Sequence, residues 1–276
     1  PYQHGIVNMK PMEIPNKLFS VILQKHGYRT AAVDCNHRIT GKNTPWFKRG
    51  FDTYIDPADR RKSHLITPAQ EINRHAIPWL RKHRREPDFF LFFITGTPHY
   101  PYRPDPSFVR RHEREAVAHH QSVRLESVLR EPLYSFIRRW SPADSDPEAI
   151  RRLYDGAVSH VDHYVGELIR TLKDLDMIDE TLVILNADHG ESLGEHRIYF
   201  DHHGLYEPTI RVPLILSLPK TLPGNRRIRA LCQHADLLPT ILDLAGIRPP
   251  QGVGFLDGRS LMPLIREKVK EIHPFV

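Results

Sequence analysis

The chain has 276 residues, of which 40% are hydrophobic and 26% charged, so it is long enough to bury one large α/β core. Its longest apolar run, Phe89 to Ile94, is far shorter than the roughly 20 residues of a membrane-spanning helix, which argues against a membrane span. The formal net charge of +6 suits an anionic substrate, but the arginine pairs are scattered, which favours a solvated basic surface over a nucleic-acid patch.

The first third of the chain alternates helical and extended patterns. Apolar residues at a helical spacing predict a helix over 18–25 that ends at Gly27. A strand is expected over 29–33. Residues 67–70 fit a capping box that opens a helix running toward Arg85. The apolar run over 89–95 lacks alternation, which is typical of a strand covered on both faces.

The rest of the chain first departs from this rhythm and then resumes it. The stretch 105–147 is rich in Arg, Glu, His and Pro and is expected to be a partly helical excursion over the surface. An apolar stripe over 150–172 predicts a long helix. Strands are expected over 181–186 and 212–218, and a short helix over 236–245.

Strands that alternate with helices predict an α/β fold with a central, largely parallel sheet and helices on both faces. We expect one domain over 1–276. Four strands are expected to share its sheet: 29–33, 89–95, 181–186 and 212–218.

In such sheets the reactive groups gather beyond the carboxyl ends of the strands. Asp188 and His189 follow the strand over 181–186, and a carboxylate beside an imidazole suits a divalent cation. Capping of the next helix is an equally open interpretation of this pair. His99 follows the strand over 89–95, between two prolines that fix its direction. A histidine in a stiff surface loop is the alternative there.

Two further pairs of histidines are less informative. His202 and His203 precede the strand over 212–218, and by themselves they favour no particular role. His160 and His163 lie on the polar face of the long helix, where a solvated surface is favoured over a metal site.

Six segments in this order resemble the sulfatase family of the alkaline phosphatase superfamily. They cover nearly the whole chain outside the excursion, and they are Gly27–Thr30, Gly50–Asp52, Pro98–Tyr102, Asp188–His196, Leu205–Leu214 and Asp236–Gly246.

The resemblance implies an alkaline-phosphatase-like sandwich and the hydrolysis of sulfate esters by a formylglycine nucleophile beside bound Ca²⁺. The family's Cys/Ser-x-Pro-x-Arg motif lies shortly before a segment like Tyr2–Gly5, so we expect this chain to be incomplete at the N-terminus. It would then lack the nucleophile and two metal-binding acids, and be inactive alone. Cys35 and Cys232 stand outside such a motif. They are expected to be free, buried thiols, and a disulfide between them is the alternative.

The resemblance also implies roles for individual residues. Asp188 and His189 match metal ligands, and His99 matches the histidine that contacts the sulfate and its leaving oxygen. His202 stands where many members have a lysine, which is a departure, since a histidine is only partly charged at neutral pH. His203 would take this role if the loop were offset by one residue.

Three other residues are expected to support the site. His196 and Glu195 are expected to orient the metal loop. Arg211 would either reach the anion or form a structural salt bridge.

Two other functions remain open at this point. A phosphodiesterase or phosphonate monoester hydrolase of the same superfamily would share the metal ligands and the fold. A truncated, non-catalytic remnant would bind anions or partners without turnover. Under the sulfatase interpretation the substrate is a sulfated small molecule or carbohydrate.

Overall fold

The computed structural model describes residues 18–34, 48–57, 68–86, 88–100, 102–109, 147–248 and 257–275. Its helices are α1 (Phe19–Lys25), α3 (Ala69–His83), α4 (Pro106–Val109), α6 (Pro147–Asp174), α7 (Glu207–Ile210), α8 (Leu237–Leu244) and α9 (Met262–Ile265). Its strands are β1 (Arg29–Asp34), β2 (Thr53–Ile55), β3 (Phe89–Ile94), β4 (Val183–Asn186), β5 (Ser192–Leu193), β6 (Tyr199–Asp201) and β7 (Leu214–Ser217). Short 3₁₀ turns are η4 (Ile178–Glu180), η5 (Glu195–Arg197) and η6 (His234–Asp236).

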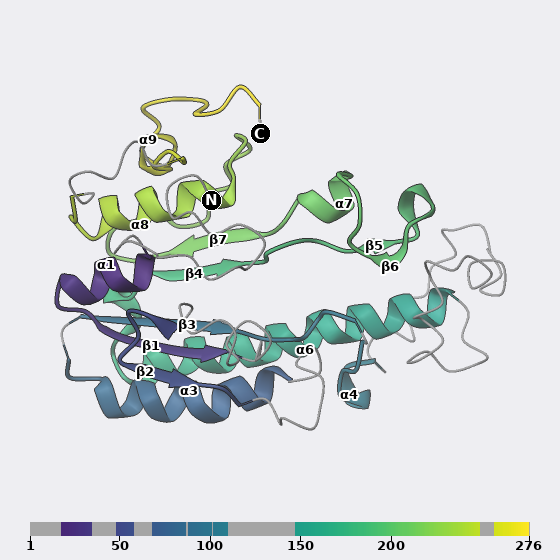
Figure 1. Ribbon diagram of the computed structural model, residues 1–276, viewed down its shortest axis with the longest axis horizontal. Coiled ribbons are helices and arrows are strands. Elements are labelled where there is room, and N and C mark those ends of the chain that lie inside the picture. The colour runs from purple at the N-terminus through teal and green to yellow at the C-terminus, as the bar shows by residue number, and fades with distance from the viewer. Residues whose placement is uncertain are drawn as a thin grey trace.

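A parallel sheet in the order β2-β1-β3 forms the centre of the first half of the chain. β1 pairs with β3 along its whole length, from Arg29 opposite Phe89 to Asp34 opposite Ile94. Helices α3 and α6 pack against each other, and in Figure 1 α3 lies below the strands while α6 runs behind them and continues past their ends. The core between them contains Ala31, Val33, Ile72, Ala76, Trp79, Leu80, Leu168 and Leu172. The α/β class with a parallel sheet and covering helices is therefore confirmed.

The opposite face of this sheet carries aromatic side chains. The Phe90 ring stacks on Phe51 at a centroid distance of 5.9 Å, and Phe19 of α1 meets Phe90 edge-on at 4.8 Å. These pairs fix α1 and the segment before β2 against the sheet, because offset and edge-on aromatic contacts add to the burial of the rings.

The expectation that four strands share one sheet is wrong. β4 pairs with β7 in a separate two-stranded sheet, which is antiparallel, with Val183 opposite Ser217. β3 is therefore an edge strand among the described residues; five of its six residues are partly buried, and Phe93 is 38% exposed. An apolar run reports burial but not the direction of its partner strand.

The predicted helices are confirmed, with small shifts at their ends. Gly27 follows α1 with a positive φ of 88°, and Gly246 follows α8 with 66°, as left-handed residues after a helix do. No helix of the described ranges has the length and apolarity needed to cross a bilayer.

Two expectations about exposure are wrong. His160 of α6 is 3% exposed, because α4 packs on this helix and places Phe108 5.0 Å from the imidazole. Cys232 is a free thiol, as expected, but it lies on the surface. The structure says nothing of the expectations for Tyr2–Gly5, Cys35 and most of the excursion, which lie outside the described residues.

Candidate functional site

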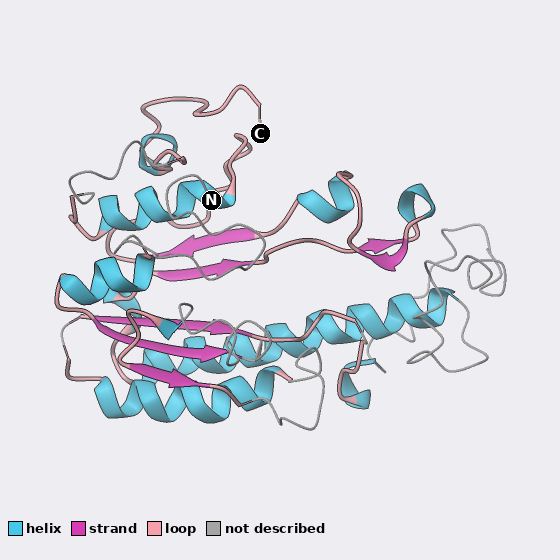
Figure 2. Cartoon of the chain, viewed as in Figure 1, coloured by secondary structure: helices cyan, strands magenta, loops and turns pink. Residues whose placement is uncertain are grey.

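Three loops bring their histidines together. The arrowheads of β1, β3 and β4 point to the same side in Figure 2, so the loops that follow β3 and β4 leave at the same end. His99 and His189 lie in these two loops, and His202 follows β6. The ring centroids are 3.9 Å apart for His189 and His202, 5.2 Å for His99 and His202, and 5.7 Å for His99 and His189. We call these three residues the histidine cluster.

A tight turn after β3 sets the direction of His99. Its backbone N–H donates to the Gly96 carbonyl at 2.9 Å, and its Nδ1 lies 2.7 Å from the Tyr100 carbonyl oxygen. The Thr97–Pro98 peptide bond in this turn is cis. Burial lowers the pKa of His99, so this imidazole is neutral at physiological pH.

Gly190 lets the loop after β4 lie directly against α7. A Cβ at this position would stand 2.0 Å from the Pro208 carbonyl oxygen, closer than any side chain permits. The Gly190 N–H donates to the Thr209 carbonyl at 2.8 Å, and the Gly190 carbonyl oxygen lies 2.8 Å from Nδ1 of His189. The glycine thus connects the orientation of His189 to the position of α7.

A buried carboxylate faces His202. Oε1 of Glu191 lies 3.5 Å from Nδ1 of His202, and the Glu191 side chain is 5% exposed. This separation exceeds that of a normal hydrogen bond, so the contact acts through charge. It raises the pKa of His202 above its ordinary value, and burial of the ring opposes the shift. The next residue back, Asp201, is also buried and accepts the His202 backbone N–H at 2.7 Å.

Asp188 lies at the open edge of the cluster. Its side chain is 76% exposed, and its Oδ2 stands 3.9 Å from Nε2 of His189. A carboxylate and an imidazole are thus accessible together to a cation from solvent. One carboxylate supplies too few oxygens for Ca²⁺, which takes six to eight, so Asp188 and His189 form only part of such a site.

The three remaining predicted site residues are not members of the cluster. His203 is 69% exposed, and its Nδ1 contacts Oδ2 of Asp201 at 2.8 Å. His196 stacks on the Tyr206 ring at 4.0 Å. Arg211 is 81% exposed, and its guanidinium lies 3.8 Å from Glu207.

Sequence reasoning missed three residues that support these loops. Glu191 and Asp201 are buried beside His202, and His234 donates from Nε2 to the Ala187 carbonyl at 2.8 Å, next to Asp188. The position of Asp201 directly before two histidines was a usable signal. His234 carried none, because its contact joins residues 47 positions apart.

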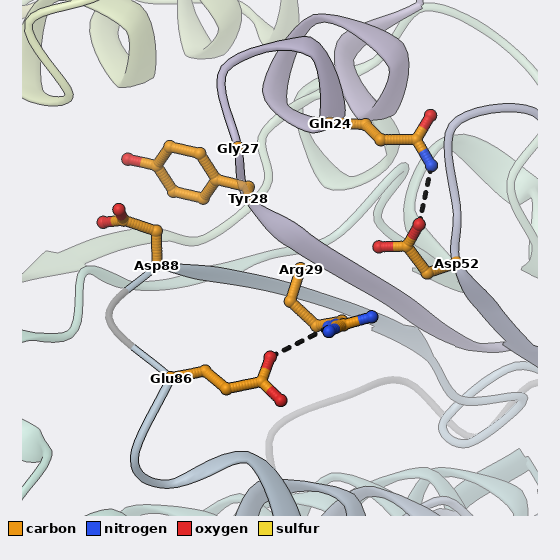
Figure 3. A pocket seen from close by; sticks show the side chains of 7 residues that line it. All are labelled: Gln24, Gly27, Tyr28, Arg29, Asp52, Glu86 and Asp88. Carbon is orange, nitrogen blue, oxygen red and sulfur yellow. Dashed lines mark hydrogen bonds and ion pairs between the residues drawn. The ribbon is translucent and has the colours of Figure 1, made fainter.

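A separate hollow of about 540 Å³ lies at the amino ends of β1 and β3, far along these strands from His99 (Figure 3). Three of its charged side chains have partners within the hollow: Arg29 pairs with Glu86 at 2.8 Å, and Asp52 accepts a hydrogen bond from Gln24 at 2.7 Å. We place the candidate site at the histidine cluster, since ligands of open α/β sheets bind beyond the carboxyl ends of the strands.

Comparison with known sequences identifies the family of this chain. The family model described as Sulfatase matches residues 1–247. Arylsulfatase K of Canis lupus familiaris is 27% identical over 309 residues, which cover 97% of this chain and 56% of that protein. Choline-sulfatase of Rhizobium meliloti (strain 1021) is 38% identical over 115 residues, 42% of this chain and 22% of that protein. The chain spans about half the length of the arylsulfatase K sequences that it matches.

Solved structures show the same fold. A protein in complex with its substrate, D-glucosamine-2-N,6-O-disulfate, matches with a TM-score of 0.76 and 19% identity, over 100% of this chain and 69% of that one. The phosphonate monoester hydrolase of Silicibacter pomeroyi matches with a TM-score of 0.70 and 21% identity, over 99% and 65% of the two chains.

Proposed function

Because the chain belongs to the sulfatase family, we propose that it is part of a sulfuric ester hydrolase that acts on a sulfated small molecule or carbohydrate. The observation that carries this proposal is the convergence of His99, His189 and His202 from three loops beyond β3, β4 and β6. The names of the relatives support the substrate class, since one is a choline-sulfatase and one neighbour binds a sulfated glucosamine. The nucleophile in this proposal is a formylglycine outside the 276 residues.

In this proposal Asp188 and His189 hold a divalent cation, Ca²⁺, together with oxygen ligands from outside the described residues. The exposed Asp188 carboxylate beside the His189 imidazole supports this assignment. A bound divalent cation would hold the sulfate group and withdraw charge from it. The 2.8 Å contact between His189 Nδ1 and the Gly190 carbonyl keeps Nε2 of His189 available as the ligand atom.

His99 and His202 act together on the leaving oxygen, with different tasks. The bridging oxygen of a sulfate ester gains negative charge as its bond to sulfur breaks, so a donor at this oxygen lowers the barrier. Glu191 raises the pKa of His202 while burial lowers that of His99. His202 is therefore the proton donor, and the neutral His99 contacts the sulfate. Environments that push two pKa values apart assign acid and neutral roles in this way.

The test compares esters with good and poor leaving groups in a complete, matured enzyme. His202→Ala should slow the ester with the poor leaving group by about 10²–10⁴-fold, the usual contribution of a general acid, and affect the good one far less. His203→Ala is the matched control from the same loop. Equal slowing of both esters by His202→Ala would show that His202 is a binding or structural residue.

The phosphonate monoester hydrolase of the same superfamily is the second candidate, because one such enzyme shares the fold. The two functions differ in the preferred substrate of the complete enzyme. A matured protein that hydrolyses a phosphonate monoester faster than an aryl sulfate would favour this alternative.

A further inference from the structure

Each imidazole of the histidine cluster has its Nδ1 directed at an oxygen that can only accept. For His99 the acceptor is the Tyr100 carbonyl at 2.7 Å, and for His189 it is the Gly190 carbonyl at 2.8 Å. The proton of each neutral ring therefore resides on Nδ1, and the lone pair remains on Nε2. Both rings are thus fixed in the tautomer that offers Nε2 to a metal ion.

His202 shows the same arrangement with a carboxylate as partner. Oε1 of Glu191 lies 3.5 Å from its Nδ1, and among the described residues neither atom has a regular hydrogen bond. The Glu191 side chain is 5% exposed, so this carboxylate faces the imidazole rather than water. A carboxylate or carbonyl behind the second ring nitrogen is the arrangement that orients histidine ligands in metal sites.

The three residues are also close enough to share one ion. One ring nitrogen of each lies within 4.8 Å of those of the other two. Zinc–nitrogen bonds near 2.1 Å place two ligands of a tetrahedral ion about 3.4 Å apart, so movements of about 1 Å close the site. The side chains of His189 and His202 are 32% and 27% exposed, which leaves a path for an ion from solvent.

We propose that His99, His189 and His202 form a three-nitrogen site for a borderline first-row transition metal ion, with Zn²⁺ as the best match. Three imidazoles suit such an ion, whereas Ca²⁺ takes oxygen ligands. Water or the Asp188 carboxylate completes the tetrahedron, since Oδ2 of Asp188 lies 3.9 Å from Nε2 of His189. The binding inference stands on this geometry alone. Its consequence, inhibition of the complete enzyme by Zn²⁺, rests on the proposed function, because the ion would occupy His99, His202 and the His189 imidazole that the proposed Ca²⁺ site also uses.

The test is calorimetric titration of the metal-free 276-residue chain with ZnCl₂, with no substrate present. We expect one tight site in the unmodified chain. His202→Gln and His99→Gln should each weaken it by more than the 10–100-fold that loss of an orienting partner costs. His203→Gln is the matched control, because its side chain is 69% exposed and it follows His202 directly. X-ray absorption at the zinc edge should show three nitrogens at about 2.0–2.1 Å.

Circular dichroism of each variant verifies that it is folded before it is titrated. Because His99 and His202 lie in different loops, the test can still be made with one variant if the other does not fold. A folded His202→Gln variant that binds Zn²⁺ as tightly as the unmodified chain overturns the proposal. So does a loss of the tight site in His203→Gln, which would place the ion elsewhere among the 18 histidines. Neither readout uses sulfatase activity, so failure of this site and failure of the proposed function are separate results.

Discussion

Gly190→Ala tests whether the close approach of the loop after β4 to α7 holds His189 in place. A Cβ at Gly190 would lie 2.0 Å from the Pro208 carbonyl oxygen and 3.0 Å from its carbonyl carbon. Ordinary contacts between carbon and oxygen begin at about 3.3 Å, so the loop and α7 must separate by about 1.3 Å. Both sides of the contact are backbone, and a rotamer change cannot relieve it. The same movement breaks the 2.8 Å hydrogen bond from Gly190 to Thr209.

We expect Gly190→Ala to lower the free energy of unfolding by about 1–3 kcal/mol, the usual cost of overpacking. In the complete enzyme, displacement of His189 by about 1 Å should reduce turnover by about 10²-fold. Urea unfolding of the chain measures the first effect, with Gly224→Ala as the control, since a Cβ there has no neighbour within 4 Å. Equal urea midpoints for the two variants would refute the claim that this contact constrains the loop.

Three further predictions concern the chain as it stands. The purified 276-residue protein should not hydrolyse an aryl sulfate, because no formylglycine motif lies in it. A matured version extended upstream should hydrolyse this ester, and turnover by the short chain would refute the prediction. Glu191→Gln should lower the pKa of His202, because the carboxylate that stabilises the imidazolium is removed; an NMR titration of the ring that shows no shift would contradict it. Ile72→Ala should cost about 2–5 kcal/mol of unfolding free energy, since this side chain is 2% exposed, whereas Val158→Ala, 43% exposed, should cost far less in the same urea assay.

The sequence supported the position of the parallel strands well. The strands expected at 29–33 and 89–95 match β1 and β3 to within a residue. Each apolar run begins after a clear boundary, which is Gly27 at the end of a helix for β1 and a charged loop for β3. The rule that reactive groups lie beyond the carboxyl ends of strands also selected the loops of His99 and His189 correctly as neighbours. Both results rest on local pattern and strand direction.

The sequence pattern does not predict contacts between segments that are distant along the chain. The antiparallel pairing of β4 with β7 could not be predicted, because both segments show an apolar run without information on direction. His160 was assigned to a solvated face because the segment that covers it, α4, comes from a stretch with patchy periodicity. Burial of Glu191 was missed because a carboxylate after Asp-His-Gly is usually solvated.

A histidine at position 202 allows two kinds of chemistry at the site. Nε2 of His202 either carries the proton that a leaving oxygen needs or binds a metal ion through its lone pair, and it cannot do both at once. Glu191 supports each state, because a carboxylate behind Nδ1 stabilises the imidazolium and also orients the neutral ring. A lysine at this position would stay protonated well above neutral pH and offer no lone pair.

His202→Lys should therefore separate the two chemistries. In the 276-residue chain it should abolish the tight Zn²⁺ site, because one of three nitrogen ligands becomes a cation that repels the ion. In the complete enzyme it should keep the proton donor and extend activity to higher pH, since the lysine pKa lies about four units above that of histidine. Calorimetry and a pH–rate profile measure the two effects. A His202→Lys chain that still binds Zn²⁺ tightly would remove His202 from the metal site. A complete enzyme whose alkaline limb does not move would remove it from the proton transfer.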